Sequence, residues 1–150
     1  MTTSETQSVD TRAGEPVATP VVSVIVTLYD EGSTLAELHR RTTAALGALG
    51  RSYEILYVDD GSTDGTFAEL ERIQVGDPHV RVVRLTRNSG QHPAMHAGLS
   101  RARGAIIVTM DGDLQNPPED IGLLVAALAI TSSLIDLIGI IGNNCDWSAD

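Results

Sequence analysis

Four runs of branched apolar residues recur along this chain, and segments with helical character separate them. The runs cover residues 21–28, 53–58, 80–85 and 105–108. The first run is β-branched and nearly continuous, which is typical of a strand that is covered on both faces. Because strands that alternate with helices favour parallel pairing, we expect an α/β fold with helices on both faces of a mostly parallel sheet.

The first two connecting segments carry the signals of amphipathic helices. Residues 34–49 place leucines on one stripe, as a helix with one buried face does. Thr34 and Glu37 have the spacing of a capping box, and Thr66 with Glu69 repeats it where the second helix should begin. The spacing predicts that both helices start with a side-chain cap.

The third connecting segment predicts a helix with Pro93 in its first turn and its end at Gly104. Ala94, Gly98 and Ala102 recur at four-residue spacing, so they form a stripe of small residues on one side of this helix. Such a stripe favours close packing of the helix against the sheet.

Acidic polar turns follow three of the four predicted strands. They contain Asp30-Glu31, Asp59-Asp60 and Asp111-Gly112-Asp113. In a parallel sheet the ligand lies beyond the carboxyl ends of the strands, so these turns should share a site. Neighbouring carboxylates repel unless a cation or a proton lies between them, and a hard divalent cation with phosphate co-ligands suits such oxygens. For any single turn, solvated aspartates are the alternative.

The net charge of −10, from 10 basic and 20 acidic residues, argues against a general nucleic-acid-binding protein. Residues 79–103 nevertheless contain five arginines and no acid, namely Arg81, Arg84, Arg87, Arg101 and Arg103. A cationic zone beside the acidic turns would suit a phosphorylated ligand, and ordinary surface arginines are the alternative.

The single cysteine, Cys145, excludes an internal disulfide framework and suits a reducing compartment. Residues 1–20 are polar, so they predict a disordered leader and not a signal peptide. Both features favour a cytoplasmic protein.

Motifs in four places along the chain can be compared with known families. They are VIVTLYDE at residues 24–31, VDDGSTDGT at residues 58–66, RNSG at residues 87–90 and DGDLQNPPE at residues 111–119. In this order and spacing they resemble family 2 glycosyltransferases of the GT-A fold, and most of all the polyprenyl- or dolichyl-phosphate sugar transferases. The resemblance covers roughly residues 21–128.

This resemblance implies a Rossmann-like domain that binds a nucleotide-diphosphate sugar, such as a UDP- or GDP-sugar. The sugar would pass to a lipid acceptor of the polyprenyl-phosphate type, which would place the protein at the cytoplasmic face of the membrane. The residues that the resemblance assigns to the nucleotide base are Thr27, Tyr29, Glu31, Val58 and Asp60.

The resemblance also implies a phosphate and metal subsite. Asp111 and Gly112 would lie near the ribose and diphosphate, and Asp113 with Gln115 would hold Mg²⁺ or Mn²⁺. The ion would stabilise the negative charge of the leaving diphosphate. The acceptor is itself a phosphate anion, so a strong general base is not required, and no catalytic residue is assigned.

The chain departs from the family pattern in its first loop and in its length. Thr27 and Asp30 stand where the family usually has Pro and Asn, and Asp30 should add negative charge near the base pocket. Family members continue well beyond the point at which this chain stops, so we expect an incomplete domain over residues 21–142 and a tail over residues 143–150. A truncated or frame-shifted product is the hypothesis, and sequencing of the downstream DNA would test it.

Residues 121–142 are apolar with one charge, so their length permits a membrane span. Polar interruptions and the lack of flanking arginines favour instead a helix over residues 118–129 and a strand near residues 134–141.

Three alternatives to a working transferase stay open. An inactive remnant is one, because half of the family domain is missing. A phosphoreceiver module gathers acids at strand ends but needs a lysine, which this chain lacks. A nucleotidyltransferase usually has a basic glycine-rich loop after the first strand, whereas the loop here, residues 29–32, is acidic.

A zinc site at His92 and His96, one helical turn apart, has no third ligand in the sequence pattern.

Overall fold

The sheet of this protein consists of five parallel strands in the order β3-β2-β1-β4-β5. The strands are β1 (Val22–Leu28), β2 (Tyr53–Asp59), β3 (Val80–Arg84), β4 (Ile106–Asp111) and β5 (Ile138–Ile140). The computed structural model describes residues 19–131 and 138–140. The predicted leader, apart from its last two residues, the tail and Cys145 lie outside the described residues.

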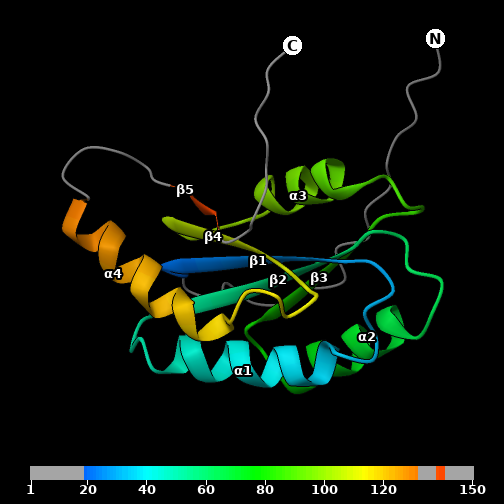
Figure 1. Cartoon of the computed structure of the whole chain (residues 1–150), viewed down its shortest axis with the longest axis horizontal. Helices are drawn as coiled ribbons and strands as arrows, with labels where there is room; N and C mark the ends of the chain where they lie inside the picture. Colours follow the sequence, from blue (N-terminus) through cyan, green and yellow to red (C-terminus); the bar gives the residue numbers. More distant parts are fainter. Residues whose placement is uncertain (1–18, 132–137, 141–150) are drawn as a thin grey trace, which may run out of the picture.

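Helices cover both faces of the sheet, as predicted. They are α1 (Leu35–Gly47), α2 (Thr66–Gly76), α3 (Gln91–Leu99) and α4 (Ile121–Thr131), with a short 3-10 helix η1 (Pro118–Asp120) before α4. Figure 1 shows α1, α2 and α4 on one side of the strands and α3 on the other. Apolar residues therefore point to both faces of the central strands, as expected for a sheet that is covered by helices on each side.

Two apolar clusters form the core, one on each face of the central strand. Val24, Val26 and Leu28 of β1 belong to the cluster beneath α1, α2 and α4. Ile25 points to the other face, where it packs with Val58 and α3 residues. Successive residues of a strand point to opposite faces, so β1 contributes to both clusters.

Close packing of α3 on the sheet depends on its small residues. A Cβ on Gly98 would lie 2.4 Å from Cγ2 of Ile25, so a larger residue would push the helix away. The predicted small-residue packing is therefore confirmed at this position. The predicted helix end was wrong, because α3 ends at Leu99, and Gly104 instead donates its backbone N–H to Ser23 Oγ at 2.7 Å.

Both predicted capping boxes were wrong. The Thr34 hydroxyl makes no cap to α1 and instead donates to the Glu31 carbonyl at 3.2 Å. At α2 the N-cap is Gly65, and the backbone N–H of Thr66 donates to Asp64 Oδ1 at 2.8 Å. The acceptor is therefore Asp64, one residue before the N-cap, whereas the pattern had placed the acidic partner at Glu69 inside the helix.

At the amino ends of the strands, Glu54 is 5% exposed and accepts hydrogen bonds from several elements. The Ser23 hydroxyl donates to it at 2.6 Å, an Arg81 Nη1 at 3.1 Å and the backbone N–H of Arg103 at 2.8 Å. This network joins β1, β2, β3 and the α3–β4 connection at the edge away from the acidic turns.

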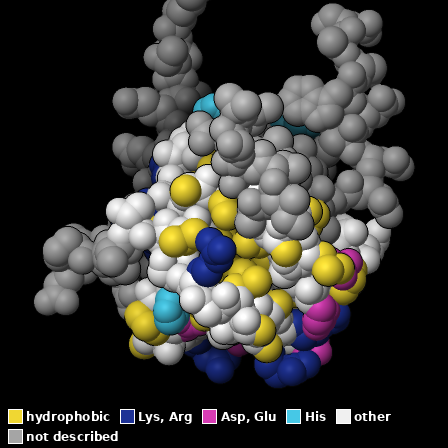
Figure 2. Space-filling view, turned by 90° about the vertical axis from the view of Figure 1, so that its left-hand side faces the viewer, with side chains coloured by type: hydrophobic (Ala, Val, Ile, Leu, Met, Phe, Trp, Pro, Cys, Tyr) yellow, Lys and Arg dark blue, Asp and Glu magenta, His cyan; other side chains and the backbone are white. Residues whose placement is uncertain are grey.

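The end of the described chain agrees with a helix followed by a strand. Helices η1 and α4 cover the segment predicted as a helix, and β5 lies within the segment predicted as a strand. No helix within residues 19–131 and 138–140 is long and apolar enough to cross a membrane. Leu123 on α4 is 72% exposed, and Figure 2 shows hydrophobic side chains on this side of the molecule.

Candidate functional site

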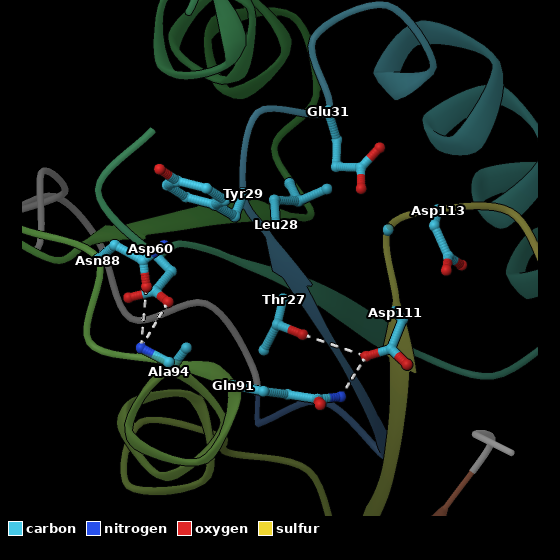
Figure 3. Close-up of a pocket in the computed structure, with 12 residues that line it drawn as sticks. Thr27, Leu28, Tyr29, Glu31, Asp60, Asn88, Gln91, Ala94, Asp111 and Asp113 are labelled. Atoms are coloured by element: carbon cyan, nitrogen blue, oxygen red, sulfur yellow. Dashed lines mark hydrogen bonds between the residues drawn. The ribbon is translucent and has the colours of Figure 1, made fainter. Parts of the chain in front are cut away.

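A cavity of about 480 Å³ lies beyond the carboxyl ends of β1, β2 and β4. The chain runs from β1 to β2 and β3 on one side and then returns to β4 on the other, so the strand order reverses next to β1. This is the place where open α/β sheets bind ligands. The cavity is lined by Thr27, Leu28, Tyr29, Glu31, Asp60, Asn88, Gly90, Gln91, Ala94, Asp111, Gly112 and Asp113. All three acidic turns contribute residues to this cavity, so the prediction that they meet at one end of the sheet is confirmed (Figure 3).

Most of the residues that the sequence singled out line this cavity. Those that do are Thr27, Tyr29, Glu31, Asp60, Asp111, Gly112 and Asp113. Val58 does not, because it is fully buried in the core beneath α3. The exposed Gln115 does not line it either, and its backbone N–H donates to Asp113 Oδ1 at 3.0 Å.

The structure adds cavity residues that the sequence analysis missed. They are Leu28, Asn88, Gly90, Gln91 and Ala94. Four of them come from the start of α3 and the loop before it. The RNSG motif marked this loop, but its approach to β1 depends on helix packing that the sequence pattern does not specify.

The backbone of β1 holds two of the acidic turns in place. Asp60 donates its N–H to the Leu28 carbonyl at 2.9 Å, and Gly112 donates its N–H to the Thr27 carbonyl at 3.1 Å. A Cβ on Gly112 would lie 2.1 Å from Cδ2 of Leu28, so the turn after β4 can approach β1 this closely because residue 112 is glycine.

Asp60 also fixes the loop before α3. Its carboxylate, in a residue that is 5% exposed, accepts the backbone N–H of Ser89 at 2.8 Å and that of Gly90 at 2.9 Å. The next residue, Gly61, has φ +69, and a Cβ there would lie 2.4 Å from the carbonyl carbon of Arg87. The Asp-Gly pair therefore both binds the loop and leaves room for it.

Asp111 is oriented by two side chains from other elements. The Gln91 side-chain amide donates to Asp111 Oδ1 at 2.8 Å, and the Thr27 hydroxyl donates to the same oxygen at 3.4 Å (Figure 3). The carboxylate is thus held between the start of α3 and the end of β1.

Negative charge accumulates around Glu31, in the turn after β1. Burial raises the pKa of the Glu31 carboxyl, and the charge of Asp113 raises that pKa further. Asp64 and Asp30 add smaller contributions in the same direction. A bound cation would relieve this repulsion.

Asp30 does not itself line the cavity, although its charge acts on Glu31, which does. It has φ 53, and its Oδ1 accepts the backbone N–H groups of Thr63 at 2.8 Å and Asp64 at 3.3 Å. Its own backbone N–H donates to Ser62 Oγ at 2.9 Å. Asp30 therefore ties the turn after β1 to the turn after β2.

The predicted cationic zone is not at the cavity, since none of its five arginines lines it. Arg81 pairs with the buried Glu54. Arg84 lies 3.4 Å from Asp59 Oδ2, and its guanidinium stacks 4.1 Å from the centre of the Phe67 ring. These two arginines stabilise the sheet and its edge.

The cavity offers oxygen ligands to a metal but does not enclose one. In the part of the chain that the structure describes, no group of three His, Cys, Asp or Glu residues could hold an ion. His92 and His96 therefore have no third ligand of these types among the described residues. Magnesium-type ions usually take one or two carboxylates and complete their shell with water and substrate phosphates, so the carboxylates of this rim fit such an ion.

Comparisons with known proteins match most of the chain. The family model described as glycosyl transferase family 2 matches residues 23–148. An undecaprenyl-phosphate 4-deoxy-4-formamido-L-arabinose transferase of Salmonella paratyphi A is 46% identical over 125 residues, which are 82% of this chain and 37% of that protein. The transferase of the same name from Klebsiella pneumoniae is 52% identical over 106 residues, which are 70% of this chain and 32% of that protein.

Solved structures share the fold. A mannosyltransferase of Pyrobaculum calidifontis in complex with GDP-Man and Mn²⁺ has a TM-score of 0.62 and 28% identity over 80% of this chain and 35% of its own. The S. aureus TarS 1-349 structure with UDP has a TM-score of 0.58 and 26% identity over 73% of this chain and 32% of its own. The chain spans about a third of the length of the relatives it matches.

Proposed function

Since the chain belongs to glycosyltransferase family 2, we propose that its cavity binds a nucleotide-diphosphate sugar together with a divalent metal ion. The observation that carries this proposal is the meeting of three acidic turns around one cavity at the switch point of the sheet. The mannosyltransferase with GDP-Man and Mn²⁺ and the TarS structure with UDP support it.

The base and ribose would lie over the end of β1. Tyr29 is 43% exposed at the cavity, so its ring is available to a nucleobase. Thr27, Glu31 and Asp60 complete this side in the proposal, and Val58 supports it from the core beneath. The nucleotide is of the UDP or GDP type.

The diphosphate would lie near Asp111 and Gly112, and Asp113 is the carboxylate that would hold Mg²⁺ or Mn²⁺. When bound, the ion supplies charge neutralisation for the departing diphosphate. Gln115 orients Asp113 through its backbone N–H, and a direct metal contact from its side chain stays a prediction.

We propose a polyprenyl-phosphate lipid as the acceptor, and therefore a place at the cytoplasmic face of the membrane. The support is that the relatives named above are undecaprenyl-phosphate sugar transferases. A phosphate acceptor is already ionised at neutral pH, so this chain's residues need to position it and do not need to remove a proton.

Calorimetric titration with UDP and GDP, with and without Mn²⁺, tests the proposal. We expect one of the two to bind with Mn²⁺, and binding to fall at least about tenfold in Asp113→Asn, because the isosteric amide lacks the charge that holds the ion. Asp120→Asn is the matched control, since Asp120 is exposed in η1 and does not line the cavity. Failure of the wild-type protein to bind either nucleotide would contradict the proposal.

A further inference from the structure

The segment from Ser89 to Gln91 runs beside the cavity and links the ends of the two strands that flank β1. At one end it is bound by Asp60, which directly follows β2, and at the other end it binds Asp111, the last residue of β4. Figure 3 shows Asp60 and Gln91 with Asp111 around the end of β1. Three consecutive residues thus connect the carboxylates on either side of the cavity.

The Asp60 end of this segment is rigid. Two backbone N–H groups converge on one carboxylate that is 5% exposed, and hydrogen bonds to a charged acceptor are stronger than neutral ones. Gly90, with φ 94, then leads directly into the first turn of α3. The backbone position of Gln91 is therefore set by Asp60.

The Gln91 end orients Asp111. An aspartate at a strand end can rotate about its side-chain bonds, and the hydrogen bond of 2.8 Å from the Gln91 amide selects one rotamer. Both protein donors, Gln91 and Thr27, share Oδ1, so a ligand would meet Oδ2. A neutral amide achieves this without cancelling the negative charge of the rim, whereas a lysine or arginine there would form an ion pair with Asp111.

We propose that Gln91 is a positioning residue for the nucleotide subsite, and that Asp60 acts through it on Asp111. This inference rests on the proposed function. Holding Asp111 in its ligand-ready rotamer means that a bound nucleotide does not have to order it, so the affinity for the nucleoside diphosphate is higher. The role belongs to Gln91, which the family-like motifs at the strand ends did not include.

Two substitutions of nearly equal size test the hydrogen bond. Gln91→Met keeps the length of the side chain but removes the donor, and Gln91→Glu keeps its shape but places a second carboxylate against Asp111. The Kd of UDP or GDP with Mn²⁺ should rise about tenfold in Gln91→Met and further in Gln91→Glu. His92→Ala is the matched control on the same turn of α3, since His92 does not line the cavity, and it should bind like wild type.

The order of affinities distinguishes positioning from a role in packing. If shape alone matters, Gln91→Glu binds as tightly as wild type, and that result would overturn the inference, as would wild-type affinity in Gln91→Met. Thermal unfolding of each ligand-free variant identifies any loss of folding, and we expect Gln91→Met to melt within about 2 °C of wild type because residue 91 is exposed. If wild type binds no nucleoside diphosphate, the proposed function fails and this inference with it, whereas intact wild-type binding with unchanged variants contradicts this inference alone.

Discussion

The carboxylates around the cavity differ in what holds them. Asp60 accepts backbone hydrogen bonds from the loop before α3, and Asp111 accepts side-chain hydrogen bonds from β1 and α3. Asp113 instead accepts the N–H of Gln115 within its own turn, and burial and neighbouring charge raise the pKa of Glu31. The first two are oriented by the fold, whereas the last two carry the repulsion that a cation would relieve.

Glu31→Gln tests this repulsion through the pH dependence of stability. Because the folded-state pKa of Glu31 is raised, the folded protein binds more protons than the unfolded chain between the ordinary and the raised pKa. The free energy of unfolding therefore falls as the pH rises through this window. Glu31→Gln should melt at a higher temperature than wild type above the window and show no such gain below it. Melting curves in metal-free buffer from about pH 4 to about pH 8 check this, and parallel pH profiles would contradict it.

At the scale of elements, the strand patterns predicted more of the fold correctly than the helix-capping patterns did. Runs rich in branched apolar and aromatic residues predicted β1, β2 and β3 and the end of the sheet at which the acidic turns meet. The caps were wrong because Asp64 accepts the first N–H group of α2, and because the Thr34 hydroxyl before α1 donates to the Glu31 carbonyl. The cavity residues of α3 were missed because the position of α3 follows from the contact of Gly98 with Ile25, which is distant in sequence.

The turn after β4 is anchored at its far end by an ion pair between α1 and η1. Arg41 binds Glu119 through Nε at 2.8 Å and Nη2 at 2.6 Å, and this bidentate contact lowers the pKa of Glu119 to about 2. The pair is therefore complete above the ordinary glutamate range and is lost as the pH falls toward that value. It fixes the exit of the turn that contains Asp113.

Arg41→Gln should weaken Mn²⁺-dependent nucleotide binding about twofold to fivefold, because the turn loses the ion pair that holds its exit. Arg40→Gln is the control: Arg40 makes a similar bidentate pair with Glu37 on the same helix, and that pair does not touch the turn. Calorimetry at low salt and at about 0.5 M salt provides the readout, since screening should shrink the difference. Equal effects of the two substitutions would show that the ion pair does not position the turn.

Across the whole molecule, the buried Glu54 network and the cavity lie at opposite ends of the parallel strands. The network of Ser23, Glu54 and Arg81 joins three strands at their amino ends, and the cavity lies at the carboxyl ends. The sequence predicted this polarity for the acidic turns. It gave no sign of the network, because a lone glutamate within a strand does not reveal which arginine lies beside it.

Glu54→Ala should lower the free energy of unfolding by about 3–5 kcal/mol, since Arg81, 9% exposed, would lose its buried carboxylate. Nucleotide affinity should stay within about twofold of wild type at a temperature where the variant is folded. Urea unfolding and calorimetry measure the two effects, and Glu71→Ala in the exposed part of α2 is the control, expected within about 0.5 kcal/mol. A large loss of affinity without a loss of stability would contradict the separation of the two edges.

Paramagnetic broadening by Mn²⁺ in the presence of the bound nucleoside diphosphate tests the account most directly, because it locates the ion on the protein. We predict that the amide signals of residues 112–115 and of Glu31 broaden first, and that Asp113→Asn abolishes this pattern. Broadening centred on His92 and His96, or spread evenly over the surface, would contradict a metal site at the acidic rim of the sheet.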